Sequence, residues 1–273
     1  MARSFNARDG VAIAQIILFT ATLGLAIAIR IQNKNGWFSM AAVSIFRLIG
    51  ASCLLATMHD GSRSVWAGAF VCESFGLILL TYLLLNQLGR VNDSLRVLTR
   101  WDFRLPDLIC WAGIGVTVAD FALASKQEDP MAPNDMTRAG FFLFISIYAW
   151  ALLLFVRLFL AREGLPPSER RAMHCFAATI APMVVRISYS LVYTVTGKEK
   201  FSAVLGSAVI YVFMTMIPEV VVMVLVAWAT LSMSRPATPD GDVEGQKGEN
   251  HEFGPVRSKD SREENGAVLE GTR

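Results

Sequence analysis

The sequence contains little charge. Only 18% of its 273 residues are Asp, Glu, Lys or Arg, and the formal net charge is +2. So small a net charge excludes the strongly basic surface of a nucleic-acid-binding protein and indicates no strongly charged partner. In contrast, 53% of the residues are hydrophobic and the mean hydropathy is +0.45. This composition is too apolar for an ordinary soluble domain and predicts a multi-pass membrane protein.

Three further features are missing. The apolar runs do not alternate with polar residues, which excludes the strands of a membrane β-barrel. The four cysteines (Cys53, Cys72, Cys110 and Cys175) lack CxxC spacing and lie in or beside apolar runs, so we interpret them as small buried residues. The first apolar run is too long for the h-region of a signal peptide and has no small-residue cleavage site after it. We therefore expect this run to act as the targeting signal.

The chain does contain a series of long apolar runs, each near the 20 residues that cross a bilayer. The runs cover residues 11–31, 40–58, 65–85, 106–125, 139–160, 173–195 and 203–232. They predict an all-α fold, a bundle of seven transmembrane helices within a domain over residues 1–232. Residues 233–273 are rich in Gly, Pro and charge, and we expect them to form a disordered cytosolic tail.

Arginines concentrate in the segments that follow every second span, and the stretch 90–104 is one of the richest. The positive-inside rule therefore predicts an outside N-terminus and a cytosolic C-terminus, in the endoplasmic reticulum or another endomembrane. Within 90–104, Val91, Leu95 and Leu98 fall on one side of a helix. This pattern predicts a basic amphipathic helix on the cytosolic surface that anchors the chain to the membrane. A partner-binding site is the alternative interpretation.

Five charged residues lie away from the ends of the predicted spans: Arg47, Glu73, Asp120, Arg186 and Glu219. A charge at this depth is costly, so each should face protein, water or a ligand rather than lipid. Depth along the spans pairs Arg47 with Glu219, and Arg186 with Asp120 or Glu73. Two arginines cannot pair three carboxylates. One interpretation is a buried polar network that specifies helix packing, and the excess acid favours a functional role instead.

The excess carboxylate is assigned to Glu73. It shares a helical stripe with Trp66 and Phe70, which offer no cation. A buried carboxylic acid without a cation stays protonated and can donate its proton. Glu73 is therefore the predicted proton donor.

The first, sixth and seventh spans contain further polar or aromatic residues of interest. Arg186 is followed at helical spacing by Tyr189 and Tyr193, and Tyr211 shares a face with Glu219. In the first span Gln15 lies well inside the apolar run. We interpret this glutamine as hydrogen-bonded to a neighbouring helix, with a ligand contact as the alternative.

Four short motifs carry a family resemblance. They are RDGVAIAQ at 8–15, RxxGA at 47–51, RVNDS at 90–94 and MxxIPE at 214–219. With these motifs the chain resembles an uncharacterised family of fungal seven-span integral membrane proteins over about residues 5–232. In size, helix count and intramembrane acidic residues it also resembles the fungal membrane terpene cyclases of meroterpenoid pathways.

The second resemblance implies an enzyme of fungal secondary metabolism, a membrane terpene cyclase (isomerase or lyase). Such an enzyme protonates a prenylated lipophilic substrate and guides the cation with aromatic faces. The candidate catalytic residues are Glu73, Asp120 and Glu219. The candidate substrate-binding residues are Trp66, Phe70, Arg186, Tyr189, Tyr193 and Tyr211, and Arg47 and Arg186 form structural ion pairs. The sequence has no Asp-rich diphosphate-binding motif, so neither a metal nor another cofactor is expected, and the partners are the substrate and the lipid bilayer.

Two other functions agree with the topology. A ligand-sensing receptor fits seven helices, although the third span ends in residues 86–90 without an acid-Arg-Tyr triplet and the last span lacks Asn-Pro-x-x-Tyr. The last span also has no lysine for a retinal Schiff base. A lipid or solute transporter predicts inverted repeats, and the sequence shows no self-similarity of that kind.

Overall fold

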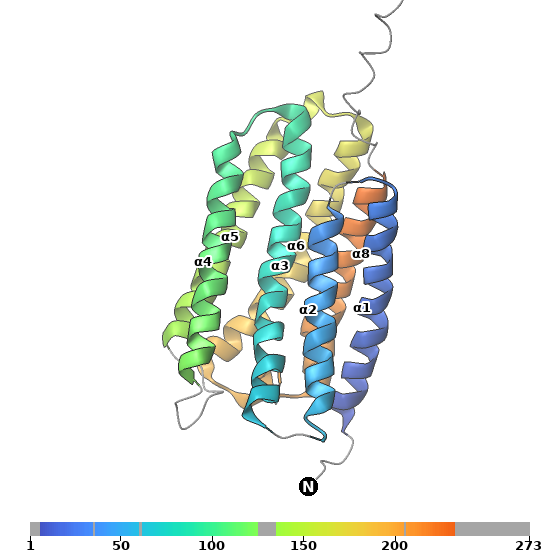
Figure 1. Cartoon of the computed structure of the whole chain (residues 1–273). Helices are drawn as coiled ribbons and strands as arrows, with labels where there is room; N and C mark the ends of the chain where they lie inside the picture. Colours follow the sequence, from blue (N-terminus) through green and yellow to red (C-terminus); the bar gives the residue numbers. More distant parts are fainter. Residues whose placement is uncertain (1–5, 35, 60–61, 125–134, 205, 233–273) are drawn as a thin grey trace, which may run out of the picture. The chain divides into compact units, whose positions relative to one another are not determined.

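The computed structural model describes residues 6–34, 36–59, 62–124, 135–204 and 206–232, and these ranges are helical without any strand (Figure 1). The long helices are α1 (Ala7–Ile31), α2 (Trp37–Ala56), α3 (Arg63–Leu95), α4 (Arg100–Ala124), α5 (Asp135–Leu160) and α6 (Pro167–Thr196). The last segment consists of α7 (Ala208–Tyr211), a π-helical turn (Val212–Met216) and α8 (Ile217–Ser232). Two short 3-10 helices, Arg162–Gly164 and Glu199–Phe201, lie in the connections.

The predicted bundle of seven helical segments is confirmed within these ranges. Six segments are long and apolar enough to cross a membrane: α1, α2, α3, α5, α6 and the last segment from α7 to α8. The helix α4 is the seventh. The chain is thus a multi-pass membrane protein, while its orientation stays a prediction and the tail at 233–273 lies outside the described residues.

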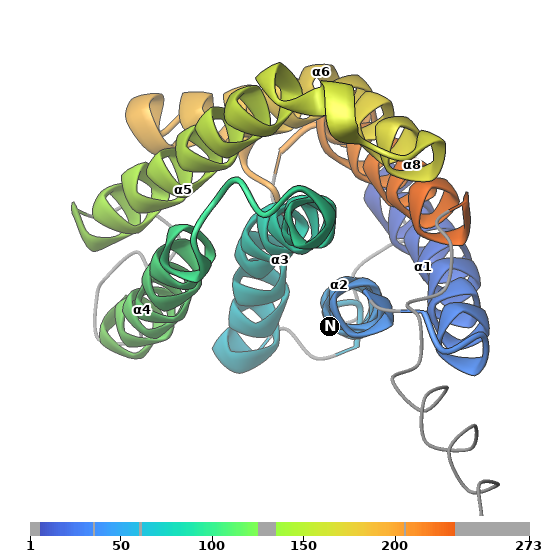
Figure 2. The same ribbon diagram turned by 90° about the horizontal axis from the view of Figure 1, so that it is seen from above.

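The helix α3 forms the centre of the bundle. It packs against α2, α4, α5, α6 and α8, and Figure 2 shows it between α2 and α4, on the inner side of the arc formed by α5 and α6. In its most apolar window 61% of the residues are buried, against 33% for α1, α2 and α6. A helix that is apolar on all sides is expected in such a buried position.

The predicted amphipathic surface helix at 90–104 is wrong. Instead, α3 continues to Leu95, Arg96 adopts a left-handed conformation with φ of 53°, and α4 begins at Arg100. The Asn92 side chain closes this turn, because it donates to the Leu98 carbonyl at 3.0 Å and accepts from the Leu98 N–H at 2.8 Å. Val91 is 1% exposed. The apolar side of the stretch therefore extends the core-facing stripe of α3 and does not lie on the membrane surface.

Small residues allow α2 and α3 to approach closely. A Cβ atom on Gly50 would lie 3.0 Å from the Cys72 Cβ, and one on Gly68 would lie 3.2 Å from the Cys53 Sγ. Both distances are shorter than ordinary van der Waals contacts. All four cysteines are free and none is exposed, which confirms their interpretation as packed small residues.

Candidate functional site

Four charged side chains from four helices meet inside the bundle. Arg47 comes from α2, Glu73 from α3, Arg186 from α6 and Glu219 from α8. The side chains of Arg47 and Arg186 are 2% exposed, that of Glu219 is 0% exposed and that of Glu73 is 12% exposed. We call these four residues the charge cluster.

Each arginine of the charge cluster donates hydrogen bonds to both carboxylates. Arg47 uses its two terminal nitrogens, Nη1 for Glu73 Oε2 and Nη2 for Glu219 Oε1. Arg186 donates from Nε to Glu219 Oε1 at 2.8 Å and from Nη2 to Glu73 Oε1 at 3.2 Å. Two cations thus balance two anions, and the cluster cross-links four helices without a net charge.

The backbone around the cluster makes room for it. A Cβ atom on Gly76, one turn from Glu73 in α3, would overlap the Arg47 guanidinium. On the last segment, Pro218 has no N–H to donate, and the π-helical turn precedes it directly. At 3.6 residues per turn, an unbroken α-helix would rotate Tyr211 and Glu219 roughly 80° apart. The wider π turn reduces this angle, which lets both side chains reach the interior.

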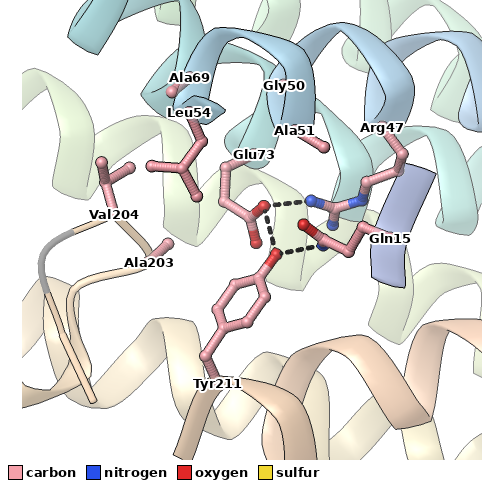
Figure 3. Close-up of a pocket in the computed structure, with 10 residues that line it drawn as sticks. All are labelled: Gln15, Arg47, Gly50, Ala51, Leu54, Ala69, Glu73, Ala203, Val204 and Tyr211. Atoms are coloured by element: carbon pink, nitrogen blue, oxygen red, sulfur yellow. Dashed lines mark hydrogen bonds and ion pairs between the residues drawn. The ribbon is translucent and has the colours of Figure 1, made fainter. Parts of the chain in front are cut away.

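The tyrosine Tyr211 links the cluster to the first helix. Its hydroxyl donates to Glu73 Oε2 at 2.8 Å and accepts from Gln15 Nε2 at 2.7 Å, as Figure 3 shows. The Arg8 guanidinium lies over the Tyr211 ring, 4.6 Å from its centroid. The predicted bond from Gln15 to a neighbouring helix is confirmed, and α1 joins the four helices of the cluster.

A family profile described as a domain of unknown function, DUF7702, matches residues 5–236, which include all of the helices. The chain belongs to the DUF7702 family. Membership confirms the part of the predicted resemblance that names an uncharacterised family. No curated protein and no solved structure shows a significant match to this DUF7702 protein.

In this DUF7702 protein Arg47 contacts Glu219 and Arg186 contacts Glu73, one of the two partners predicted for Arg186. The expectation that Glu73 lacks a cation is wrong, because both arginines donate to it. Trp66 and Phe70 share a helical stripe with Glu73, but this stripe contains only residues of the same helix. It does not predict which side chains of other helices contact Glu73. The side chain of Asp120 lies outside the described residues.

The remaining candidate residues lie around the cluster at different distances. Tyr189 is 1% exposed, donates to the Ser202 carbonyl at 3.1 Å and has its ring centroid 6.3 Å from that of Tyr211. Tyr193 lies one turn further along α6 and is half-buried. Trp66 and Phe70 pack against a small apolar group that includes Val204. Tyr189 therefore borders the aromatic side of the cluster, next to Tyr211.

Sequence reasoning missed one residue, Arg8. It is 7% exposed, and it donates from Nη1 to the Gly206 carbonyl at 3.1 Å in addition to its contact with Tyr211. Arg8 precedes the first apolar run, and a charged residue at the end of a span is usually exposed. The sequence feature that could have identified Arg8 is its separation from Gln15. Seven residues correspond to two helical turns, which places both side chains on one face of α1.

A small cavity adjoins the cluster at Glu73 and Tyr211. Its volume is about 20 Å³, which is enough for a single water molecule. It is lined by Gln15, Arg47, Gly50, Ala51, Leu54, Ala69, Glu73, Ala203, Val204 and Tyr211 (Figure 3). Among the described residues, no group of three or more His, Cys, Asp or Glu side chains is placed to hold a metal ion.

Proposed function

We propose that this DUF7702 protein is a ligand-sensing membrane receptor in which the charge cluster is the conformational switch. The observation that carries the proposal is the cross-bridging of two arginines and two glutamates over four helices. Each carboxylate contacts both arginines, so a movement of one helix changes at least two of the four contacts at once. Packed elements with two discrete arrangements are what allosteric proteins use to transmit a signal.

The cluster also keeps unused hydrogen-bonding capacity. Glu219 Oε2, Arg47 Nε and the Thr215 hydroxyl are buried and have no hydrogen-bond partner in the described part of the chain. Buried polar atoms are normally paired, and an exception calls for an explanation. In a switch these atoms are the ones that form new contacts when the pairs rearrange.

The ligand of this receptor is a small lipophilic molecule with a polar end. Its entry point is the cavity beside Glu73 and Tyr211, where a hydroxyl or amine group takes the place of one water molecule. Such a group competes with Tyr211 for Glu73 Oε2, the oxygen that also accepts from Arg47. The ligand then favours the arrangement in which the cluster is open, because it has extra contacts only there.

The terpene cyclase has weaker support. The cavity of about 20 Å³ is far below the roughly 300 Å³ at which sites for whole small molecules begin, so either function requires the bundle to open. Glu73 and Glu219 each accept hydrogen bonds from two guanidinium groups. A carboxylate held in this way is a poor proton donor. The cyclase therefore also requires a carboxyl group that is released from the arginines and protonated, which the receptor does not.

Spin-label distance measurements in lipid nanodiscs test the switch. One label replaces Val97 in the connection between α3 and α4, and the other replaces Arg170 near the start of α6. Both positions are exposed. The Glu73→Gln variant should add a second population of distances, because it weakens all contacts to that carboxylate. Thr81→Val is the matched control, since Thr81 is buried in α3 and donates only to the Leu77 carbonyl.

A single unchanged distance distribution in both Glu73→Gln and Glu219→Gln, with the helices intact, would contradict the receptor. That result would leave a static network that only fixes helix packing. Mass spectrometry of a host fed farnesylated aromatic precursors, with and without the chain, tests the cyclase separately. A cyclised product that depends on Glu73 would favour the enzyme.

A further inference from the structure

A second and larger hollow lies at the other end of the bundle, where α2 begins, α3 ends and α4 begins. Its volume is about 520 Å³, within the usual range for ligand sites of about 300–1,000 Å³. It is lined by Gly36, Phe38, Ser39, Tyr82, Leu85, Asn86, Gly89, Arg90, Asn92, Asp93, Arg100, Phe103, Arg104 and Asp107. We call this hollow the groove. It shares no lining residue with the cavity beside Glu73.

Arginines of two helices border the groove. Arg90 comes from the end of α3, and Arg100 and Arg104 come from the first turns of α4, where both are exposed. The planar guanidinium group suits phosphate because it presents several N–H donors in a fixed geometry. Asp93 and Asp107 also line the groove, so the cations exceed the anions by one. The groove is therefore suited to an anionic group.

The lining also has an apolar part, beside the polar side chains of Ser39, Asn86 and Asn92. Phe38 is 64% exposed although it lines the groove, and Leu85 and Phe103 lie further inside. Figure 2 shows α2 and α4 on either side of α3, and the lining residues come from these three helices, including the N-cap of α2, so the groove lies over α3 between α2 and α4. Gly89 leaves space on the α3 side: a Cβ atom there would lie 3.8 Å from the Phe103 ring. An apolar chain can thus enter from the bilayer.

Exposed aromatic and basic side chains mark the end of the bundle that holds the groove. Trp101, in the first turn of α4, is 72% exposed and has the Arg104 guanidinium 5.8 Å from its ring centroid. Exposed tryptophans and arginines at helix ends are typical of the membrane interface. In the predicted orientation this end faces the cytosol, where anionic lipids concentrate.

We propose that the groove binds an anionic phospholipid from the bilayer, with its phosphate between Arg90, Arg100 and Arg104 and one acyl chain against Phe38 and Phe103. This site is independent of the receptor proposed above, because none of its residues belongs to the charge cluster. A free phosphate compound would share the arginines but would leave the apolar side of the groove unused.

The test reconstitutes the full chain in phosphatidylcholine vesicles with and without phosphatidic acid. Native mass spectrometry then counts the lipids that remain bound after extraction. The wild type should retain phosphatidic acid in preference to phosphatidylcholine. The double variant Arg100→Gln with Arg104→Gln should bind it about twentyfold more weakly, since each basic residue near the surface contributes roughly fivefold.

Two matched controls separate a built site from general attraction. Arg170→Gln with Arg171→Gln removes the same charge from exposed positions at the same end of the bundle, outside the groove lining. This control should bind like the wild type. Gly89→Ala should also bind normally, because the added methyl group fits, whereas Gly89→Leu should fill the groove and abolish retention.

Three outcomes would overturn the proposal. Equal losses in the two double arginine variants would show diffuse surface electrostatics. Unchanged retention in Arg100→Gln with Arg104→Gln would exclude these arginines as headgroup ligands. Displacement of phosphatidic acid by inorganic phosphate at a comparable concentration would show a site for a soluble phosphate compound. The arginine variants decide the question even if Gly89→Leu does not fold.

Discussion

The charge cluster and the groove use similar residue types for opposite purposes. In the cluster, Arg47 and Arg186 are 2% exposed and held by two carboxylates beside a cavity of about 20 Å³. In the groove, Arg100 and Arg104 are exposed beside a hollow of about 520 Å³. Burial explains the difference, because a buried charge cannot leave its partner without a large penalty, whereas water can replace the partner of an exposed charge. The charged residues of this protein thus form an internal ion-pair cluster where they are buried and line an open hollow where they are exposed.

The largest expected effect comes from removing one cation of the cluster. Arg186→Leu leaves two buried carboxylates with a single arginine, and the free energy of unfolding should fall by about 3–5 kcal/mol. Thermal unfolding in detergent measures the change. Arg100→Leu in the groove is the comparison, and its effect should stay within about 1 kcal/mol. Similar losses in both variants would remove the distinction between the two regions.

Removing a cation and an anion together should be less damaging than the single changes predict. Arg186→Leu combined with Glu73→Gln restores the charge balance of the cluster, with Arg47 and Glu219 still paired. A double-mutant cycle on the unfolding free energies should give a favourable coupling of about 1–3 kcal/mol. Additive losses would show that the two residues do not act as members of one cluster.

The close approach of α3 to Arg47 is tested by adding one methyl group. Gly76→Ala places a Cβ atom on the Arg47 guanidinium, and the resulting shift should destabilise the fold by about 1–3 kcal/mol. Gly24→Ala in α1 is the matched control. A Cβ atom at Gly24 meets nothing within 4 Å, so helix propensity should make this change neutral or stabilising by up to about 1 kcal/mol. Tolerance of Gly76→Ala would show that Arg47 can move without loss.

The smallest expected effect concerns the connection to α1. Tyr211→Phe removes the hydroxyl between Gln15 and Glu73 and should lower the unfolding free energy by about 1–2 kcal/mol, mainly because the Gln15 amide loses its acceptor. Adding Gln15→Leu to Tyr211→Phe should recover part of this loss, since the buried amide that lost its acceptor is then removed. An unchanged melting temperature in Tyr211→Phe would mean that α1 is not held through this contact.

The sequence alone determined the number and type of the helices. Runs of about 20 apolar residues can satisfy their backbone hydrogen bonds in a membrane only as helices or closed barrels, and this constraint is local. The sequence also predicted the pairing of Arg47 with Glu219, because depth along a span can be counted in residues. Gln15 was predicted to contact a neighbouring helix for the same reason.

Tertiary structure decided which charges share a site. Glu73 and Arg186 are separated by 113 residues in the chain, yet Nη2 of the arginine lies 3.2 Å from Oε1 of the glutamate. The stripe on α3 predicted a carboxylate without a cation, because helical periodicity reports which side chains share a face but not which helix covers that face. Similarly, the polar residues after Leu85 suggested the end of a span, but packing of Val91 against the core continues α3 to Leu95. The arrangement of helices around α3 therefore created both the charge cluster and the groove.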